Sequence, residues 1–216
     1  MPLVSHLLSK WLGAISKTQG RSDLETIRSI SKALKENDII GLFPEGTRTW
    51  DGNTVDIVGS TAKLVRMFKV PVVFINIEGG FAKKPRWADK ERKGSVFLHV
   101  MKVLYPEEIQ KMSLPEISAE VEENLMFSHD EWIEKHPEIE YRGPVAEGIE
   151  RVLYICPECR SIQTYVSSQK SAKCSCCSSV VNVDLLKFKT TSCAGISSMN
   201  FLKTLSSTTA PSSDKT

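Results

Sequence analysis

The chain has 216 residues and a formal net charge of +2, with 41% hydrophobic and 25% charged residues. This length accommodates one sizeable core and a small accessory module, and the composition is that of an ordinary soluble globular protein. The small net charge argues against a generalised nucleic-acid binder, and no stretch reaches the roughly 20 apolar residues that cross a bilayer. The N-terminus lacks the pattern of a signal peptide, so we expect a cytoplasmic protein.

The first predicted element is an amphipathic stretch near the N-terminus. Its apolar residues recur at helical spacing and form one stripe, made of Leu3, Val4, Leu7, Leu8, Trp11, Leu12 and Ile15. The stripe suits either a core face or a face that lies on a membrane surface. A capping box of Ser22 with Glu25 then predicts a helix that ends near Asn37.

A strand is expected over 39–43, and it leads into the run Phe43-Pro44-Glu45-Gly46-Thr47-Arg48. The proline and the glycine of this run predict a tight turn. The turn also carries a guanidinium, whose planar fork of N–H donors matches phosphate oxygens. The sequence therefore predicts a phosphate-binding turn, although Pro-Glu-Gly-Thr alone also fits an ordinary turn.

Helices and strands alternate through the middle of the chain. Four segments follow one another: a short helix over 62–68, an apolar strand over 70–77, a charged loop over 83–94 and an apolar strand over 95–104. The near-continuous apolar runs predict strands that are covered on both faces. A second capping box, Ser113 with Glu116, predicts a helix from about Leu114 towards Ser128. This alternation indicates an α/β fold, with helices that flank a sheet.

Two pairs of cysteines, Cys156 with Cys159 and Cys174 with Cys177, lie near the C-terminus. Four thiolates in such pairs suit tetrahedral zinc, because each two-residue spacer lets both sulfurs face one ion. Short strand-like segments around them complete the pattern of a zinc ribbon over 151–186. Since cysteine fills all four ligand positions, the zinc is expected to be structural.

Alternatives remain open for these cysteines. They also fit reduced thiols without a metal or a disulfide pair, and Cys176 can replace a neighbour as ligand. After the ribbon, 13 of the 27 residues from Thr190 onward are serine or threonine. Such a segment has little apolar surface to offset its chain entropy, so residues 187–216 are expected to form a disordered tail.

The turn closely resembles the third sequence block of the glycerolipid acyltransferases, a family that includes 1-acylglycerol-3-phosphate acyltransferase. In that family the block holds the glycerol-phosphate acceptor. The resemblance therefore implies that the acceptor is bound by Glu45, Gly46, Thr47 and Arg48. It extends over roughly residues 10–105 and implies a partial acyltransferase-type sheet within a domain over 1–150.

Two further blocks carry this resemblance. The stretch 13–23 is similar to the second block, but Gln19 stands where that block has its phosphate-binding arginine. Arg21 is the nearest basic residue, and the resemblance makes it a candidate for the same role. The run Val70-Pro71-Val72-Val73 is similar to the fourth block, which lines the site.

The family's first block, a histidine with an aspartate five positions later, is not found in this sequence. In the family the histidine deprotonates the acceptor hydroxyl and the aspartate orients the imidazole. His129 is followed at that spacing by Glu134, and we expect His129 to be a solvated residue at a helix end. The resemblance implies that the first block belongs upstream of Met1, and that the chain as given lacks its general base.

The function implied by the resemblance is acyl transfer in phospholipid synthesis. The donor would be acyl-CoA or acyl-carrier protein, and the acceptor a glycerol phosphate like lysophosphatidic acid. The protein would act peripherally at the inner face of the cell membrane, where the apolar stripe and the loop over 83–93 with Trp87 would meet anionic lipid.

Two other functions remain open. One is a catalytically silent fragment that still binds lipid phosphate, and the other is a zinc-ribbon module that docks on a protein. Nucleic acid is not expected as a partner. Between Ser161 and Val181 the ribbon has only Lys170 and Lys173 as basic residues, too few for a surface that follows a phosphate backbone.

Overall fold

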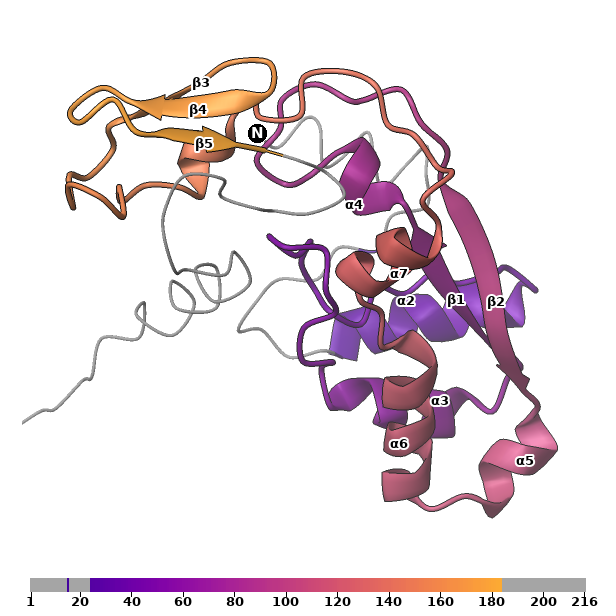
Figure 1. Ribbon diagram of the computed structural model, residues 1–216. Helices are drawn as coiled ribbons and strands as arrows, with labels where there is room; N and C mark the ends of the chain where they lie inside the picture. Colours follow the sequence, from indigo (N-terminus) through magenta and orange to yellow (C-terminus); the bar gives the residue numbers. More distant parts are fainter. Residues whose placement is uncertain (1–14, 16–23, 184–216) are drawn as a thin grey trace, which may run out of the picture. The chain divides into compact units, whose positions relative to one another are not determined.

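The computed structural model describes residue 15 and residues 24–183. The chain forms two compact units, of which the first ends at Pro44 and the second begins at Glu45. Helices and two small sheets make up the described residues, which gives the mixed α/β class that the sequence predicts (Figure 1). None of the described helices is long and apolar enough to cross a membrane.

The first unit contains helix α2, Leu24–Lys35, as the sequence predicts. Glu25 lies in its first turn and Lys32 in its last, which complements the helix dipole. The apolar stripe over 3–12, the expected cap Ser22 and the candidate Arg21 lie outside the described residues, as does the tail over 187–216.

The strand predicted over 39–43 is wrong. This segment has no regular secondary structure, and the side chains of Ile39 and Phe43 are 98% and 75% exposed. A strand is stable only when its backbone N–H and C=O groups pair with a neighbour. All the strands that the structure describes belong to the second unit, and this segment belongs to the first.

The first sheet of the second unit consists of β1, Val72–Glu78, and β2, Phe97–Leu104, which run antiparallel. The prediction that these strands are covered on both faces is wrong. Phe74 and Asn76 of β1 are buried, whereas the alternating side chains of Val73, Ile75 and Ile77 are between 42% and 49% exposed. Most of β2 is exposed as well. The difference arises because the described helices of the second unit pack against one face of the sheet.

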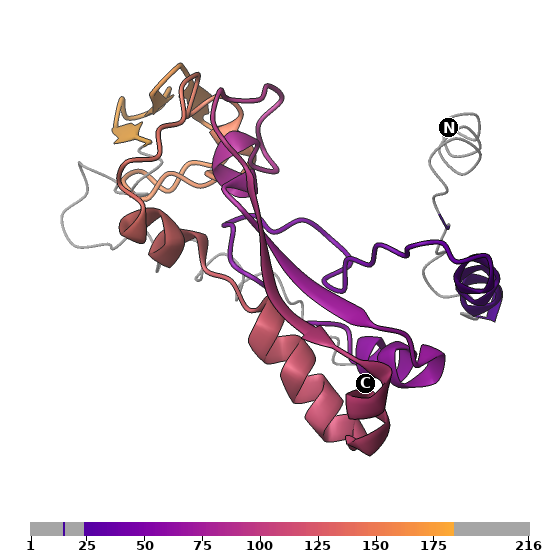
Figure 2. The ribbon, with the colours of Figure 1, turned by 90° about the vertical axis from the view of Figure 1, so that its right-hand side faces the viewer.

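That face is covered by α3, Ser60–Phe68, α5, Pro106–Lys111, and α6, Leu114–Leu125. Figure 2 shows α6 beside the two strands, which it also contacts. The core between these elements comprises Ala62, Phe74, Leu104, Ile109, Ile117 and Val121. The predicted capping box begins α6, since the Glu116 carboxylate accepts the Ser113 N–H at 2.6 Å and the Ser113 hydroxyl accepts the Glu116 N–H.

Between β1 and β2 lie the short helix α4, Gly80–Lys83, and a charged loop over 84–94. The prediction that Trp87 of this loop meets lipid is wrong, because its side chain is only 1% exposed. Arg92 is equally buried and donates to the Ala82 and Val145 carbonyls at 2.8 and 2.6 Å. Burial lowers the pKa of Arg92 to about 10, so its guanidinium remains charged at neutral pH.

After α6 come α7, His129–Lys135, and the short helix η1, Ile149–Arg151. A three-stranded antiparallel sheet then follows, in the order β3, Tyr165–Ser167, β4, Ser171–Cys174, and β5, Val180–Asn182. Its buried side chains share one core with Trp87 and Ala88 of the charged loop.

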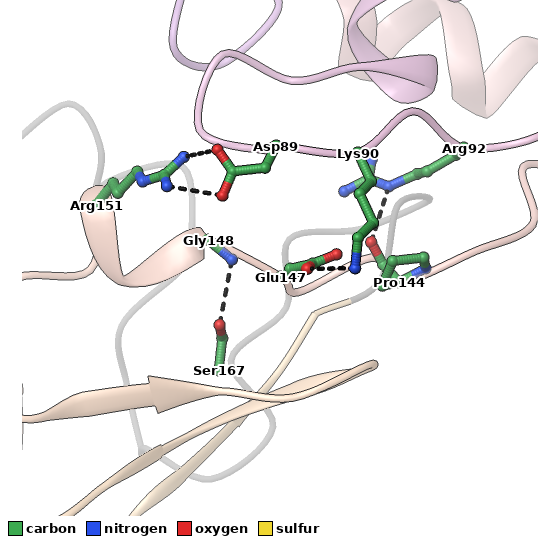
Figure 3. A network of polar contacts seen from close by, with 8 residues as sticks. All are labelled: Asp89, Lys90, Arg92, Pro144, Glu147, Gly148, Arg151 and Ser167. Carbon is green, nitrogen blue, oxygen red and sulfur yellow. Dashed lines mark hydrogen bonds and ion pairs between the residues drawn. The ribbon is translucent and has the colours of Figure 1, made fainter.

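Polar contacts join the same two regions (Figure 3). Arg151 forms a bidentate ion pair with Asp89 at 2.7 and 2.8 Å, and Lys90 pairs with Glu147 at 3.0 Å. The segment that the sequence assigns to a ribbon therefore contacts the connection between β1 and β2 through both apolar and charged groups.

Candidate functional site

The predicted phosphate turn opens the second unit, with Glu45, Gly46, Thr47 and Arg48 in consecutive positions. The φ angle of Gly46 is +70°, in the left-handed region that favours glycine. A Cβ atom added to Gly46 would meet no atom within 4 Å among the described residues. The turn therefore exposes its backbone to solvent, and a ligand can approach it closely.

Backbone contacts hold the turn in place. The Glu45 carboxylate accepts the Val55 N–H at 3.3 Å. Further along, the Thr49 hydroxyl accepts the Gly52 N–H at 3.1 Å, and the Thr54 N–H donates to the Phe127 carbonyl at 2.9 Å. The segment that follows the turn is thus tied to the connection between α6 and α7.

Two guanidinium groups lie at this turn, one within it and one that contacts it from the loop over 84–94. Arg48 is exposed and forms no ion pair with a described residue, so its charge is available to a ligand. The second is Arg86, which donates from Nη1 to the Thr47 hydroxyl at 3.1 Å and to the Arg48 carbonyl at 2.8 Å. Sequence reasoning missed Arg86 as a site residue, because no spacing rule relates two positions that lie 38 residues apart.

His129 is buried, and the prediction of a solvated histidine is wrong. Its side chain is 1% exposed and packs against the ring of Phe81, at 4.8 Å between centroids. Neither ring nitrogen has a hydrogen-bond partner among the described residues, which include Glu134. Burial and the charge of Arg92 lower the pKa of His129 to about 4, so the imidazole is neutral at pH 7.

The four predicted cysteine ligands lie together. The sulfur atoms of Cys156, Cys159, Cys174 and Cys177 are all within 4.8 Å of one another. Cys156 and Cys177 are separated by 3.6 Å, and Cys159 and Cys174 by 3.8 Å. A tetrahedral ion with metal–sulfur bonds of about 2.3 Å needs sulfurs about 3.8 Å apart. The cluster can therefore hold one metal ion, and it includes Cys177 rather than Cys176.

The same backbone turn presents each pair of cysteines. The Cys156 N–H donates to the Ser161 carbonyl at 2.9 Å, and the Arg160 N–H donates to the Cys156 carbonyl at 2.9 Å. Cys174 makes the matching two bonds with residues 178 and 179, at 3.0 and 2.8 Å. The φ angles of Arg160 and Ser178 are +61° and +63°, so both turns place a non-glycine residue in the left-handed region.

Electrostatics around the sulfurs favour negative charge at two of them. A hydrogen bond from the Thr164 hydroxyl lowers the pKa of Cys174. Burial raises the pKa of the Cys156 thiol, but the Cys159 N–H and the hydroxyls of Ser179 and Tyr165 outweigh it and lower that pKa to about 5. Hydrogen bonds from Ser161 lower the pKa of Cys159, yet burial and the neighbouring sulfurs raise it to about 12. Four sulfurs this close therefore do not all ionise readily without a cation between them.

The family comparison covers the first part of the chain. Residues 1–78 match the family model described as Acyltransferase. The match contains the phosphate turn and ends at Glu78, the last residue of β1. It covers 78 of the 216 residues and supports an acyltransferase family for this part of the chain, and with it acyl transfer in general. No curated protein and no solved structure matches the chain.

The acyltransferase match and the cysteine cluster are separate in the sequence. Cys156 lies well beyond Glu78, and so does Arg86, although Arg86 contacts the turn inside the matched segment. Arg21 lies inside the match but outside the described residues. Among the predicted acceptor ligands, Glu45, Gly46, Thr47 and Arg48 lie together because they are consecutive in the turn. The structure also places Arg86 against Thr47 and Arg48.

Proposed function

We propose that this protein binds the glycerol-phosphate acceptor of an acyl-transfer reaction in phospholipid synthesis, with acyl-CoA or acyl-carrier protein as donor. The observation that carries this proposal is the exposed turn in the acyltransferase match. There, Arg48 has no ion-pair partner among the described residues, and the backbone of Gly46 is open. A guanidinium beside accessible backbone N–H groups suits a phosphate.

Each residue of the turn takes a distinct part in this proposal. Arg48 donates charge-assisted hydrogen bonds to the phosphate, while Gly46 and Thr47 let it approach the backbone. The Glu45 carboxylate braces the turn against Val55, and its second oxygen can accept a glycerol hydroxyl. Arg21, from the second sequence block, is proposed as a further contact to the phosphate. The protein would meet the membrane surface peripherally on its cytoplasmic side.

Acyl transfer also needs a group that takes the proton of the acceptor hydroxyl as that oxygen attacks the thioester carbonyl. His129 is buried and its ring nitrogens have no hydrogen-bond partner among the described residues, and the printed sequence has no His-x-x-x-x-Asp. We therefore expect negligible turnover from these 216 residues alone, and activity once an N-terminal His-x-x-x-x-Asp segment is present. The measurement is thioester consumption with lysophosphatidic acid as acceptor.

A second candidate function is a catalytically silent protein that binds lipid phosphate. It is favoured by the burial of His129, whose ring nitrogens have no hydrogen-bond partner among the described residues. In that case, binding would persist without turnover even in an N-terminally extended chain. Loss of thioester consumption on His129→Ala would instead show that the buried histidine is the base.

The binding test centres on Arg48. Arg48→Lys keeps the charge but loses the planar fork, so it should weaken the binding of a short-chain lysophosphatidic acid by about 1 kcal/mol or more, and Arg48→Ala by more. The matched control is Arg142→Ala, which removes an exposed arginine paired with Glu140. Equal affinities of wild type and Arg48→Ala would show that the turn is only structural.

We further propose that the four cysteines hold one structural zinc ion. The donor set supports this assignment, because four thiolates with tetrahedral separations suit zinc and leave no position for water. Metal analysis of protein purified without added zinc should give about one equivalent per chain. Four freely titratable thiols with less than about a tenth of an equivalent would contradict it.

A further inference from the structure

A second positive group is fixed against the phosphate turn from a distant part of the chain. Arg86 uses both hydrogens of Nη1, one toward the Thr47 hydroxyl and one toward the Arg48 carbonyl. Its Cζ lies 4.4 Å from the ring centroid of Trp50, which fixes the plane of the guanidinium by a cation–π contact. Because arginine has five N–H donors, those on Nε and Nη2 remain without a partner among the described residues.

The residues on both sides of Arg86 hold it in place. Pro85 and Trp87 are almost fully buried, and the Trp87 carbonyl accepts from Arg151 at 2.6 Å. The ion pair of Arg151 with Asp89 fixes the next part of the loop (Figure 3). Arg86 therefore projects from a loop segment that the cysteine-bearing part of the chain immobilises. A side chain held in this way loses little freedom when a ligand binds.

No described carboxylate neutralises the two guanidinium groups. Neither Arg48 nor Arg86 forms an ion pair with a residue that the structure describes, and the nearby Glu45 carboxylate accepts a backbone N–H. The Arg86 guanidinium donates to the backbone carbonyl of Arg48, whose side chain carries the other guanidinium. Two like charges beside one open turn favour an anion with more than one negative charge.

We propose that Arg86 is a second phosphate-binding residue of the turn, and that Arg48 and Arg86 together select a phosphomonoester over a phosphodiester. The inference rests on the proposed acceptor site and names its specificity. A phosphomonoester carries about −1.5 to −2 charge at pH 7 and offers three oxygens. A diester carries a single charge and has one of those oxygens blocked.

The test is equilibrium binding to the zinc-loaded full chain, with glycerol 3-phosphate as the monoester and glycerophosphocholine as the diester. Arg86→Gln keeps a donor for the Thr47 and Arg48 oxygens but removes the charge. It should weaken glycerol 3-phosphate binding roughly 10- to 100-fold and change diester binding far less. The control Arg142→Gln removes one charge from an exposed pair with Glu140 and should change neither.

The pH dependence gives an independent readout. Because the second ionisation of a phosphomonoester has a pKa of about 6, wild-type binding should tighten as the pH rises from about 5 to 7.5. Arg86→Gln should flatten this rise, which loss of a structural brace alone would not do. Should Arg86→Gln fail to fold, Trp50→Leu supplies the second variant. It should weaken monoester binding about 2- to 5-fold, because the guanidinium loses the ring that orients it.

Three outcomes would overturn the inference. In the first, Arg86→Gln binds glycerol 3-phosphate as tightly as wild type does. In the second, it loses monoester and diester binding equally. In the third, it weakens only the binding of coenzyme A, which would assign Arg86 to the donor site. If Arg48→Gln also leaves monoester binding unchanged, the acceptor site itself fails. If Arg48→Gln weakens binding and Arg86→Gln does not, only the role of Arg86 fails. If Arg86→Gln weakens the binding of inorganic phosphate as much as that of glycerol 3-phosphate, the result would support the paired charges and show that the glycerol group is not recognised.

Discussion

The proposed phosphate turn and the cysteine cluster are built in opposite ways. The turn is exposed, its glycine has open space beside it, and hydrogen bonds from Val55 to Glu45 and from Arg86 to Thr47 and Arg48 hold it in place. The sulfurs of the cluster converge on one point, with Cys156 and Cys174 fully buried, Cys159 half-buried and Cys177 exposed. A group that must accept a ligand has to stay accessible, whereas four converging thiolates suit an ion that is bound permanently. The difference agrees with the roles proposed above, in which the turn exchanges a ligand and the cluster holds a structural ion.

The largest expected effect comes from breaking the cluster. Cys159→Ser should abolish stoichiometric zinc binding and unfold the three-stranded sheet, because metal binding and folding are coupled in small modules of this kind. Since Trp87 and Ala88 share the core of that sheet, amides near them should exchange rapidly as well. Hydrogen exchange followed by mass spectrometry checks both regions.

The matched control for this variant is Cys176→Ser, which changes an exposed cysteine outside the cluster and should keep zinc and protection intact. Amides around Ile117 should stay protected in both variants, because they belong to the other core. Protection lost throughout α6 in Cys159→Ser would show that the two cores do not unfold separately.

A smaller effect is the pH dependence of stability that comes from the buried His129. The folded-state pKa of His129 is about 4, below its ordinary 6.5, so the unfolded chain binds the proton more readily. The stability that this group contributes is present above pH 6.5 and is lost as the pH falls towards 4, by about 3 kcal/mol in total. Denaturant titrations across this range should show a shallower decline for His129→Leu. An unchanged decline would mean that His129 does not remain neutral in the fold.

The smallest expected effect sharpens the account of the cysteine turns. Ser178 has a φ angle of +63°, which costs a residue with a Cβ atom more than it costs glycine. Ser178→Gly should therefore stabilise the zinc-loaded protein by roughly 0.5–1 kcal/mol. The control is Ser175→Gly, at a position whose φ is not positive, and this variant should destabilise the protein. Thermal unfolding at fixed zinc concentration measures both changes.

Local chemistry made part of the molecule predictable from the sequence. The capping box at Ser113 and the two cysteine pairs depend on contacts between residues that are near in sequence, and the structure confirms the helix and the cluster. The strand over 39–43 failed because its stability depends on a partner strand that no local pattern reveals. The prediction that both faces of the first sheet are covered failed for a similar reason. The apolar composition of a strand does not show which layers pack against it.

Long-range placement accounts for the errors at the candidate site. His129 lies among acidic neighbours and looked solvated, but Phe81 and Trp132 enclose it. Trp87 looked like a lipid contact within a charged loop, yet the later strands bury it. Arg86 belonged to the same charged loop, and only the folded chain shows which of its basic residues reaches the turn.

The ion pair between Arg151 and Asp89 spans 62 residues, and this span has a consequence for synthesis on the ribosome. At translation rates of about 5–20 residues per second, Arg151 is synthesised on the order of several seconds after Asp89. During that interval the loop with Arg86 lacks the sheet against which Trp87 packs. A nascent chain thus displays the turn and Arg48 before the loop that carries the second guanidinium has become rigid.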